Sequence, residues 1–161
     1  DELKGIIETA NEYGMVSAAH AHGDEGMRRA VEAGITSIEH GTFMSDQTMD
    51  LMIKKGTYYV PTISAGEFVV EKAKIPGFFP DVVVPKALEV GPQISDTFSK
   101  AYKRGVKIAF GTDAGVFPHG ESRNETHGSY QICYHDCLAI IKNRETIWLN
   151  RTWENGRYYC C

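Results

Sequence analysis

The feature of this sequence that most constrains its fold is a unit that occurs twice between residues 14 and 41. In each unit a glycine opens a short apolar run, and a histidine stands six residues after that glycine: Gly14 leads to His20, and Gly34 leads to His40. Both runs are too short for helices and are bounded by glycine, which suits buried strands. The residues between the units have the apolar spacing of a packed helix. Two strands joined through a helix predict parallel pairing.

The same order of helix, glycine and strand recurs along the first 110 residues. Apolar runs at 15–19, 35–39, 57–63 and 106–110 are interpreted as strands, each preceded by a glycine and a helical pattern. Four such units in series predict parallel strands joined by right-handed crossovers. The sequence therefore predicts an α/β fold, built either as a (β/α) barrel or as an open wound sheet.

The segment 64–92 interrupts this order. It contains four prolines and the apolar run from Ile75 to Phe79. A long connection of this composition is more often a lid or a binding loop than a plain linker. We expect the fourth helix only after this segment, with its apolar stripe beginning at Ile94.

Two of the predicted helices begin next to residues that commonly cap helix amino termini. Asp24 precedes the apolar stripe of the second helix, and Ser45 precedes that of the third. A side-chain oxygen at this position accepts a hydrogen bond from a backbone N–H of the first turn. We predict Asp24 and Ser45 as the N-caps.

A third residue able to carry chemistry follows the fourth predicted strand. Asp113 lies at the end of the run that begins at Val106. In parallel α/β folds, chemistry gathers at the carboxyl ends of the strands, which is where His20, His40 and Asp113 fall. Imidazole and carboxylate are preferred ligands of zinc and similar ions, and catalytic sites leave one position open for water. These three residues predict a metal site at one rim of the sheet, with Asp113 also able to move a proton.

Composition limits the partners of the chain. Its 161 residues are enough for one domain with a real core. A net charge of -4 provides no basic surface for nucleic acid. No apolar run approaches the roughly 20 residues that a membrane-spanning helix needs, and the first 20 residues lack a signal-peptide pattern. We expect a small-molecule or dipeptide-like substrate, no nucleic acid or membrane partner, and a cytoplasmic location, with a homo-oligomer as an open alternative.

Three motifs together carry a family resemblance. The stretches His20-Ala-His22-Gly, Ile38-Glu-His40-Gly and Gly111-Thr-Asp113-Ala-Gly resemble the later half of the metal-dependent amidohydrolase superfamily. The nearest likeness is to its imidazolonepropionase-like and Xaa-Pro dipeptidase-like branch, and it covers roughly residues 1–121. In that family, strands five, six and eight of a (β/α)8 barrel end in a His, a His and an Asp.

The resemblance implies that His20 belongs to strand five, His40 to strand six and Asp113 to strand eight. The fold class expected from it is a partial (β/α)8 barrel of the TIM type that covers strands five to eight. The chain begins within a helical pattern and has no initiator methionine, so we expect it to start at the helix before strand five. The family's His-x-His pair on strand one and its lysine on strand four then lie outside this chain.

The function implied by the resemblance is hydrolysis of amide or peptide-like C–N bonds by a metal-activated water. His20, His40 and Asp113 are the implied metal ligands, and Asp113 is the implied catalytic residue. The implied cofactor is a divalent metal, zinc by preference, with one or two ions in the complete parent. One alternative is a deaminase or cyclic-amide hydrolase of the same superfamily with Glu25 as proton carrier. Another is a catalytically incompetent half-barrel that self-associates through its uncovered sheet edge.

Three residues are candidates for substrate binding. His22 could be the metal ligand in place of His20, but the six-residue spacing shared with His40 favours His20 and leaves His22 for the substrate. Thr62 stands six residues after Gly56, at the position equivalent to the two histidines. His119 follows the fourth strand, and the resemblance suggests a substrate-side role for it.

The last forty residues have a different pattern. Residues 1–122 form the predicted half-barrel, whereas 123–161 show weak periodicity and end in Cys160-Cys161. A further amphipathic helix is expected after the fourth strand, and its stripe is faint. We interpret 123–161 as an atypical tail that is not native to the fold.

Overall fold

The computed structural model describes residues 2–117 of the chain, in which helices and strands alternate over most of the length. The elements are α1 (Glu2–Glu12), β1 (Ala18–Ala21), α2 (Asp24–Ala33), β2 (Ser37–His40), α3 (Asp46–Lys55), β3 (Tyr58–Val60), α4 (Ile63–Ala73), α5 (Val84–Arg104) and β4 (Lys107–Ile108). The four strands form one sheet in the order β1-β2-β3-β4, and every neighbouring pair is parallel. The predicted α/β architecture with a parallel sheet is confirmed.

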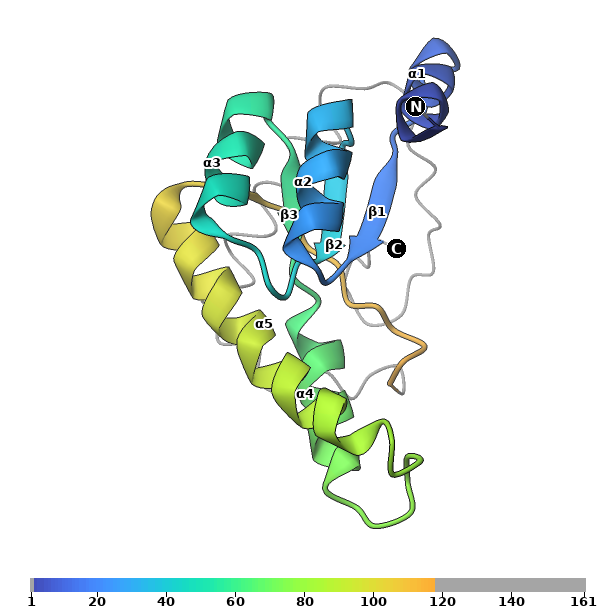
Figure 1. Cartoon of the computed structure of the whole chain (residues 1–161), viewed down its shortest axis with the longest axis vertical. Coiled ribbons are helices and arrows are strands. Elements are labelled where there is room, and N and C mark those ends of the chain that lie inside the picture. The colour runs from blue at the N-terminus through green and yellow to red at the C-terminus, as the bar shows by residue number, and fades with distance from the viewer. Residues whose placement is uncertain (1, 118–161) are drawn as a thin grey trace, which may run out of the picture.

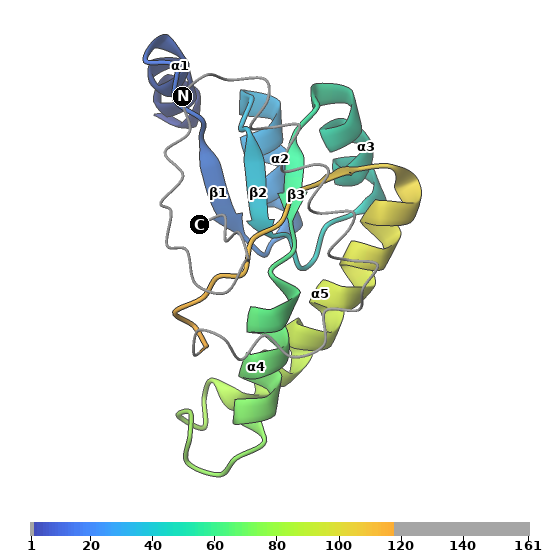
Figure 2. The ribbon, with the colours of Figure 1, turned by 180° about the vertical axis from the view of Figure 1, so that it is seen from behind.

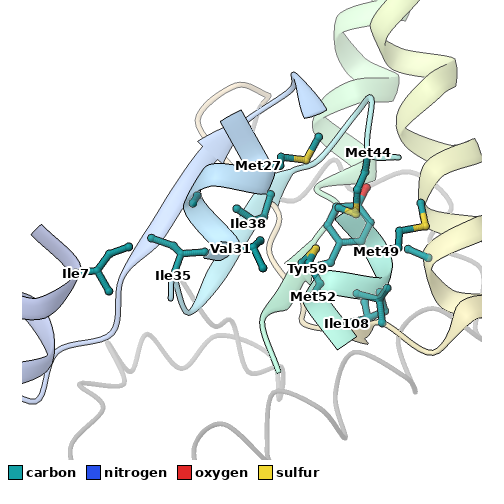
Figure 3. Close-up of a cluster of buried hydrophobic side chains, with 13 residues drawn as sticks. Ile7, Met27, Val31, Ile35, Ile38, Met44, Met49, Met52, Tyr59 and Ile108 are labelled. Carbon is teal, nitrogen blue, oxygen red and sulfur yellow. The ribbon is translucent and has the colours of Figure 1, made fainter. Parts of the chain in front are cut away.

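One face of the sheet is covered by α2 and α3 (Figure 1). The register aligns Ile38 with Tyr59 and Tyr59 with Ile108, so these side chains form one buried row that faces the two helices. Methionines from α2 and α3 complete this core (Figure 3). No helix among the described residues covers the opposite face of the sheet, which Figure 2 shows from behind.

The predicted cap of the third helix is confirmed, and that of the second is wrong. The Ser45 hydroxyl accepts from the Thr48 N–H at 3.2 Å. At the start of α2 the N-cap is Gly23, and Asp24 is already the first helical residue. From there its carboxylate accepts from the backbone N–H of Ser45 at 2.7 Å, so it ties the start of α2 to the start of α3.

The predicted long loop over 64–92 is also wrong. Most of this segment is helical, because α4 and α5 form a hairpin connected by residues 74–83. Pro85 lies in the first turn of α5, where a missing N–H costs nothing, although Pro92 lies inside the helix. The hairpin extends from the side of the sheet at which the strands end (Figure 1).

Two glycines allow α4 and α5 to pack closely. A Cβ atom on Gly91 would lie 2.0 Å from Cγ2 of Val70 and 2.9 Å from the carbonyl oxygen of Gly66. Only residues without a Cβ permit this approach, so the hairpin is a packed pair rather than a loose lid. None of the helices in the described part is long and apolar enough to cross a membrane.

Candidate functional site

Three imidazole rings meet at the carboxyl ends of β1 and β2. The centroid of the His20 ring lies 4.5 Å from that of His40 and 4.8 Å from that of His22. The His22 and His40 rings stack at 5.1 Å. His20 lies within β1, His22 follows the end of that strand, and His40 is the last residue of β2. The parallel register therefore brings all three rings to one edge of the sheet.

The backbone turns sharply at His40. Its φ of 68° lies in the left-handed region, and the N–H of Gly41 reaches back to the carbonyl of Glu39 at 2.9 Å, which closes a three-residue turn. The same N–H also donates to Ala21 of the neighbouring strand at 3.0 Å. The hydroxyl of Tyr59 donates to the carbonyl of His40 at 2.9 Å. The end of β2 is thus held from both adjacent strands.

Two threonines hold two of the rings. Oγ1 of Thr42 lies 2.6 Å from Nδ1 of His22, and Oγ1 of Thr62 lies 2.7 Å from Nδ1 of His40. Thr42 lies two residues after the end of β2, and Thr62 lies two residues after the end of β3. The hydroxyl of Thr62 also donates to the carbonyl of Pro61 at 2.8 Å.

Strained backbone is concentrated at these strand ends. Among the described residues, the only non-glycine positions with positive φ are His40 (68°), Thr62 (48°) and Asp113 (54°). They follow or end β2, β3 and β4. Such conformations cost on the order of 1–3 kcal/mol each and gather at functional sites. Thr62 is the clearest outlier, since a β-branched residue rarely adopts this region.

Burial at the site favours the neutral form of two of its imidazoles. Burial lowers the pKa of His40, and the nearby His20 and His22 lower it further, while the carboxylate of Asp113 acts in the opposite direction. Burial likewise lowers the pKa of His22, with His20 and Lys86 adding to the effect. The neutral ring is the form that binds a metal ion.

A carboxyl group that sequence reasoning missed lies beside the cluster. Burial raises the pKa of Glu39, and the charge of Asp113 raises it further, against the opposing effect of a hydrogen bond from the Ser37 hydroxyl at 2.7 Å. Thr42 was also missed, and Tyr59 was expected mainly as a sheet residue. Thr42 follows His40 by two residues, as His22 follows His20, so the repeated offset was the available signal for it.

The predicted site residues are thus partly brought together. His20, His22, His40 and Thr62 lie in one cluster, and Asp113 is near enough for its charge to act on His40. His119 and the predicted tail 123–161 lie outside the described residues.

The side chains of the site include donors of the kind that bind divalent ions. Neutral imidazole and carboxylate are the donor types that zinc prefers, and they fit the prediction. Within residues 2–117, however, no three His, Cys, Asp or Glu side chains are grouped so as to hold a metal ion. The described residues supply suitable donors without closing a site, and the assignment of His20, His40 and Asp113 as ligands stays a prediction.

The sequence also matches a known family. The model of the Amidohydrolase family matches residues 1–142, which is most of the chain. The chain belongs to the amidohydrolase family. The resemblance predicted from the three motifs is confirmed.

The chain is also similar to individual proteins of known structure or sequence. A crystal structure of a Xaa-Pro dipeptidase with bound methionine superposes with a TM-score of 0.74 at 60% identity, over 84% of this chain and 32% of that one. Ochratoxinase of Aspergillus niger is 33% identical over 117 residues, covering 70% of this chain and 23% of the enzyme. Its crystal structure superposes with a TM-score of 0.70 at 28% identity, over 84% of this chain and 32% of that one.

A third relative is an uncharacterized protein of Mycobacterium bovis. It is 30% identical over 161 residues, which cover 94% of this chain and 41% of that protein. The chain therefore spans less than half the length of each of these relatives.

Proposed function

We propose that this chain is part of a metal-dependent hydrolase that cleaves amide or peptide-like C–N bonds, with dipeptides as its substrates. The observation that carries the proposal is the cluster of His20, His22 and His40 at the carboxyl ends of parallel strands in an amidohydrolase-family chain. The 60% identity to a protein described as a Xaa-Pro dipeptidase supports the dipeptide as substrate. In this proposal β1 to β4 correspond to strands five to eight of a (β/α)8 barrel.

The predicted site residues would have separate roles in metal binding, proton transfer and substrate binding. His20, His40 and Asp113 would hold a divalent metal, zinc by preference, as part of a site for one or two ions that other strands complete. When bound, the metal supplies a Lewis acid and a water acidified toward neutral pH. Asp113 would take a proton from the attacking water and return it to the leaving nitrogen. His22 and His119 are proposed to lie on the substrate side, whereas Thr62, also predicted there, is buried and bonded to His40.

The test uses the full-length protein, its zinc content and its release of amino acids from Xaa-Pro dipeptides. Asp113→Asn keeps the size of the side chain and tolerates a left-handed φ, so it removes the charge without adding backbone strain. We expect it to lower kcat/KM by about 10²–10⁴-fold, the usual contribution of a general base. His20→Ala should lower both zinc content and turnover.

Asp81→Asn is the matched control, since Asp81 is exposed between α4 and α5. It should leave zinc content and turnover unchanged. The proposal is wrong if His20→Ala and Asp113→Asn also leave both unchanged.

The deaminase alternative depends on Glu25 as proton carrier. In the structure this carboxylate is exposed and bonds to Arg28 at 2.9 Å and to Arg29 at 2.8 Å. Hydrogen bonds from Arg28 and Arg29 lower the pKa of Glu25. A carboxylate stabilised in this way is a poor proton carrier at neutral pH. Amino-acid release without ammonia, and an unaffected Glu25→Gln variant, would distinguish the dipeptidase from the deaminase.

The other alternative, a self-associating half-barrel without activity, is favoured by one observation. The sheet face opposite α2 and α3 has no helix over it in the described part of the chain (Figure 2). The solution mass and zinc content of the 161-residue chain, measured together, test this alternative. A metal-free oligomer would favour it, and a chain with stoichiometric zinc would favour a metal site.

A further inference from the structure

The hydroxyl group of Thr62 has two partners and only one proton. It lies 2.8 Å from the carbonyl oxygen of Pro61 and 2.7 Å from Nδ1 of His40. A carbonyl oxygen can only accept, so the proton of the hydroxyl is used in the bond to Pro61. The hydroxyl oxygen then accepts from the ring, and Nδ1 of His40 must carry a hydrogen. A neutral ring with a proton on Nδ1 has its lone pair on Nε2.

We infer that Thr62 is a positioning residue that holds His40 as the Nδ1–H tautomer and so reserves Nε2 as the atom that ligates the divalent metal. A hydrogen bond to one ring nitrogen determines which nitrogen is free for a metal, and it also fixes the plane of the ring. The tautomer is a property of this chain alone, whereas the metal ligation rests on the proposed function.

The surroundings of Thr62 favour a fixed pair of hydrogen bonds, one to Pro61 and one to His40. Its side chain is only 4% exposed, so water does not compete strongly for the hydroxyl. Its φ of 48° is unfavourable for a β-branched residue and is kept because the neighbouring contacts hold it. Tyr59 binds the carbonyl of the same histidine. Tyr59 in β3 and Thr62 just after that strand thus fix the backbone and the ring of His40, respectively.

The neighbouring pair of His22 and Thr42 provides a contrast within the same site. Oγ1 of Thr42 lies 2.6 Å from Nδ1 of His22, but among the described residues this hydroxyl has no second partner that would use its proton. The bond therefore forms with either tautomer of His22. Removing the Thr42 hydroxyl should leave the tautomer of His40 as it is, which makes Thr42→Val the matched control for Thr62→Val.

The test uses the full-length protein, labelled with ¹⁵N in its histidines and stripped of metal by a chelator. Two-bond ¹⁵N–¹H couplings report which ring nitrogen of His40 carries the proton. We expect Nδ1–H in the wild type, a shift toward Nε2–H in Thr62→Val, and no change in Thr62→Ser or Thr42→Val. Valine keeps the shape and β-branching of threonine, and serine keeps the hydroxyl.

Zinc affinity is measured on the same proteins by competition with a chromophoric chelator. Loss of a group that orients a metal ligand costs roughly 10–100-fold in affinity, so Thr62→Val should bind zinc that much more weakly. Thr62→Ser should restore binding to near the wild-type value. If Thr62 had only a structural role, Thr62→Val would lower the melting temperature, but zinc affinity would not be lost in Thr62→Val and restored in Thr62→Ser.

Each outcome decides one of the two claims. Nε2–H on His40 in the wild type overturns the inference, even if Thr62→Val fails to fold. An unchanged tautomer and zinc affinity in Thr62→Val overturns it as well. If the wild type has Nδ1–H but binds no zinc, the tautomer stands while the metal role of His40 and the proposed function both fail.

Discussion

The hydroxyl of Tyr59 donates to the carbonyl of His40 at 2.9 Å and thereby connects the middle of β3 to the last residue of β2. Tyr59 is fully buried, and its ring lies in the core between the sheet and its helices (Figure 3). Burial raises the pKa of the Tyr59 hydroxyl well above its usual value, so it stays protonated and remains a donor. The strained turn at His40 is therefore bonded to a side chain of the buried core.

Tyr59→Phe tests this connection. The change keeps the ring in the core and removes only the donor, so we expect a loss of about 1 kcal/mol in the free energy of unfolding, as for a typical buried hydrogen bond. Urea titration of the full chain measures it. Tyr13→Phe is the control, because Tyr13 is 78% exposed and its change should have no measurable effect. Equal stability of the two variants would show that the bond contributes nothing.

The local patterns of the sequence predicted the alternation of helices and strands well. The glycine-bounded apolar runs predicted the parallel strands. The six-residue spacing from glycine to histidine in two of them predicted that His20 and His40 lie at the same edge of the sheet. The spacing of apolar residues and the positions of glycines predict strands and helices because both depend on only a few neighbouring residues. The expected fourth helix corresponds to the second half of α5, but α4 and the start of α5 were missed. Their prolines indicate loops, whereas the helices are stabilised by packing between Gly66 and Gly91.

The environment of the site was less predictable than its position. Thr62 was predicted from the repeat as a pocket residue, but its bond to His40 depends on a left-handed φ that no sequence period reveals. Tyr59 looked like an ordinary strand residue, and its bond to His40 depends on the register between β2 and β3. Contacts of this kind join residues about 20 positions apart, so they follow only from the assembled sheet.

Gly41→Ala should be strongly destabilising for two separate reasons. The residue has a φ of 59°, and an added Cβ would lie 2.5 Å from Cε2 of Tyr59 and 2.9 Å from the side-chain methyl of Met44. Left-handed strain costs about 1 kcal/mol, and overpacking a core costs about 1–3 kcal/mol more. Gly77→Ala is the matched control, because Gly77 has a φ of 77° with nothing within 4 Å of an added Cβ.

Urea unfolding of the two glycine variants separates strain from collision. We expect Gly77→Ala to lower the free energy of unfolding only by the cost of its left-handed backbone, about 1 kcal/mol. Gly41→Ala should lower it by at least about 2 kcal/mol in total. Equal losses would mean that the turn at His40 relaxes freely and that the contact with Tyr59 does not restrict it. That result would contradict the rigid strand end described above.

Gly91→Ala tests whether α4 and α5 pack as closely as the structure indicates. Glycine to alanine inside a helix ordinarily stabilises by about 0.5–1 kcal/mol, but here the new methyl group would collide with Val70 and the Gly66 carbonyl. We expect a net loss of about 1–2 kcal/mol, because overpacking exceeds the helix-forming gain. Gly5→Ala in α1 meets nothing within 4 Å and should be stabilising. A stabilising Gly91→Ala would contradict the close packing of the hairpin.

Asp24→Asn tests the hydrogen bond that connects the starts of α2 and α3, because the stabilisation by the Asp24 charge depends on pH. Burial raises the pKa of Asp24, but the Ser45 N–H, the Thr48 and Ser45 side chains and the charge of Arg28 outweigh it, so the pKa lies below its usual value. A carboxyl whose pKa is lowered by folding stabilises the fold above its unfolded pKa, and this stabilisation is lost as the pH falls through the folded pKa.

The stability difference between wild type and Asp24→Asn should therefore be constant from pH 7 down to about 5 and then shrink below about pH 4, where the unfolded carboxyl begins to protonate. Asparagine retains an oxygen that can accept from Ser45, so the difference reports the charge. Because Asp24 is only partly buried, we expect no more than about 1 kcal/mol at neutral pH, measured by urea unfolding. A difference that does not vary between pH 7 and 3 would show that the charge of Asp24 has no part in joining the two helix starts.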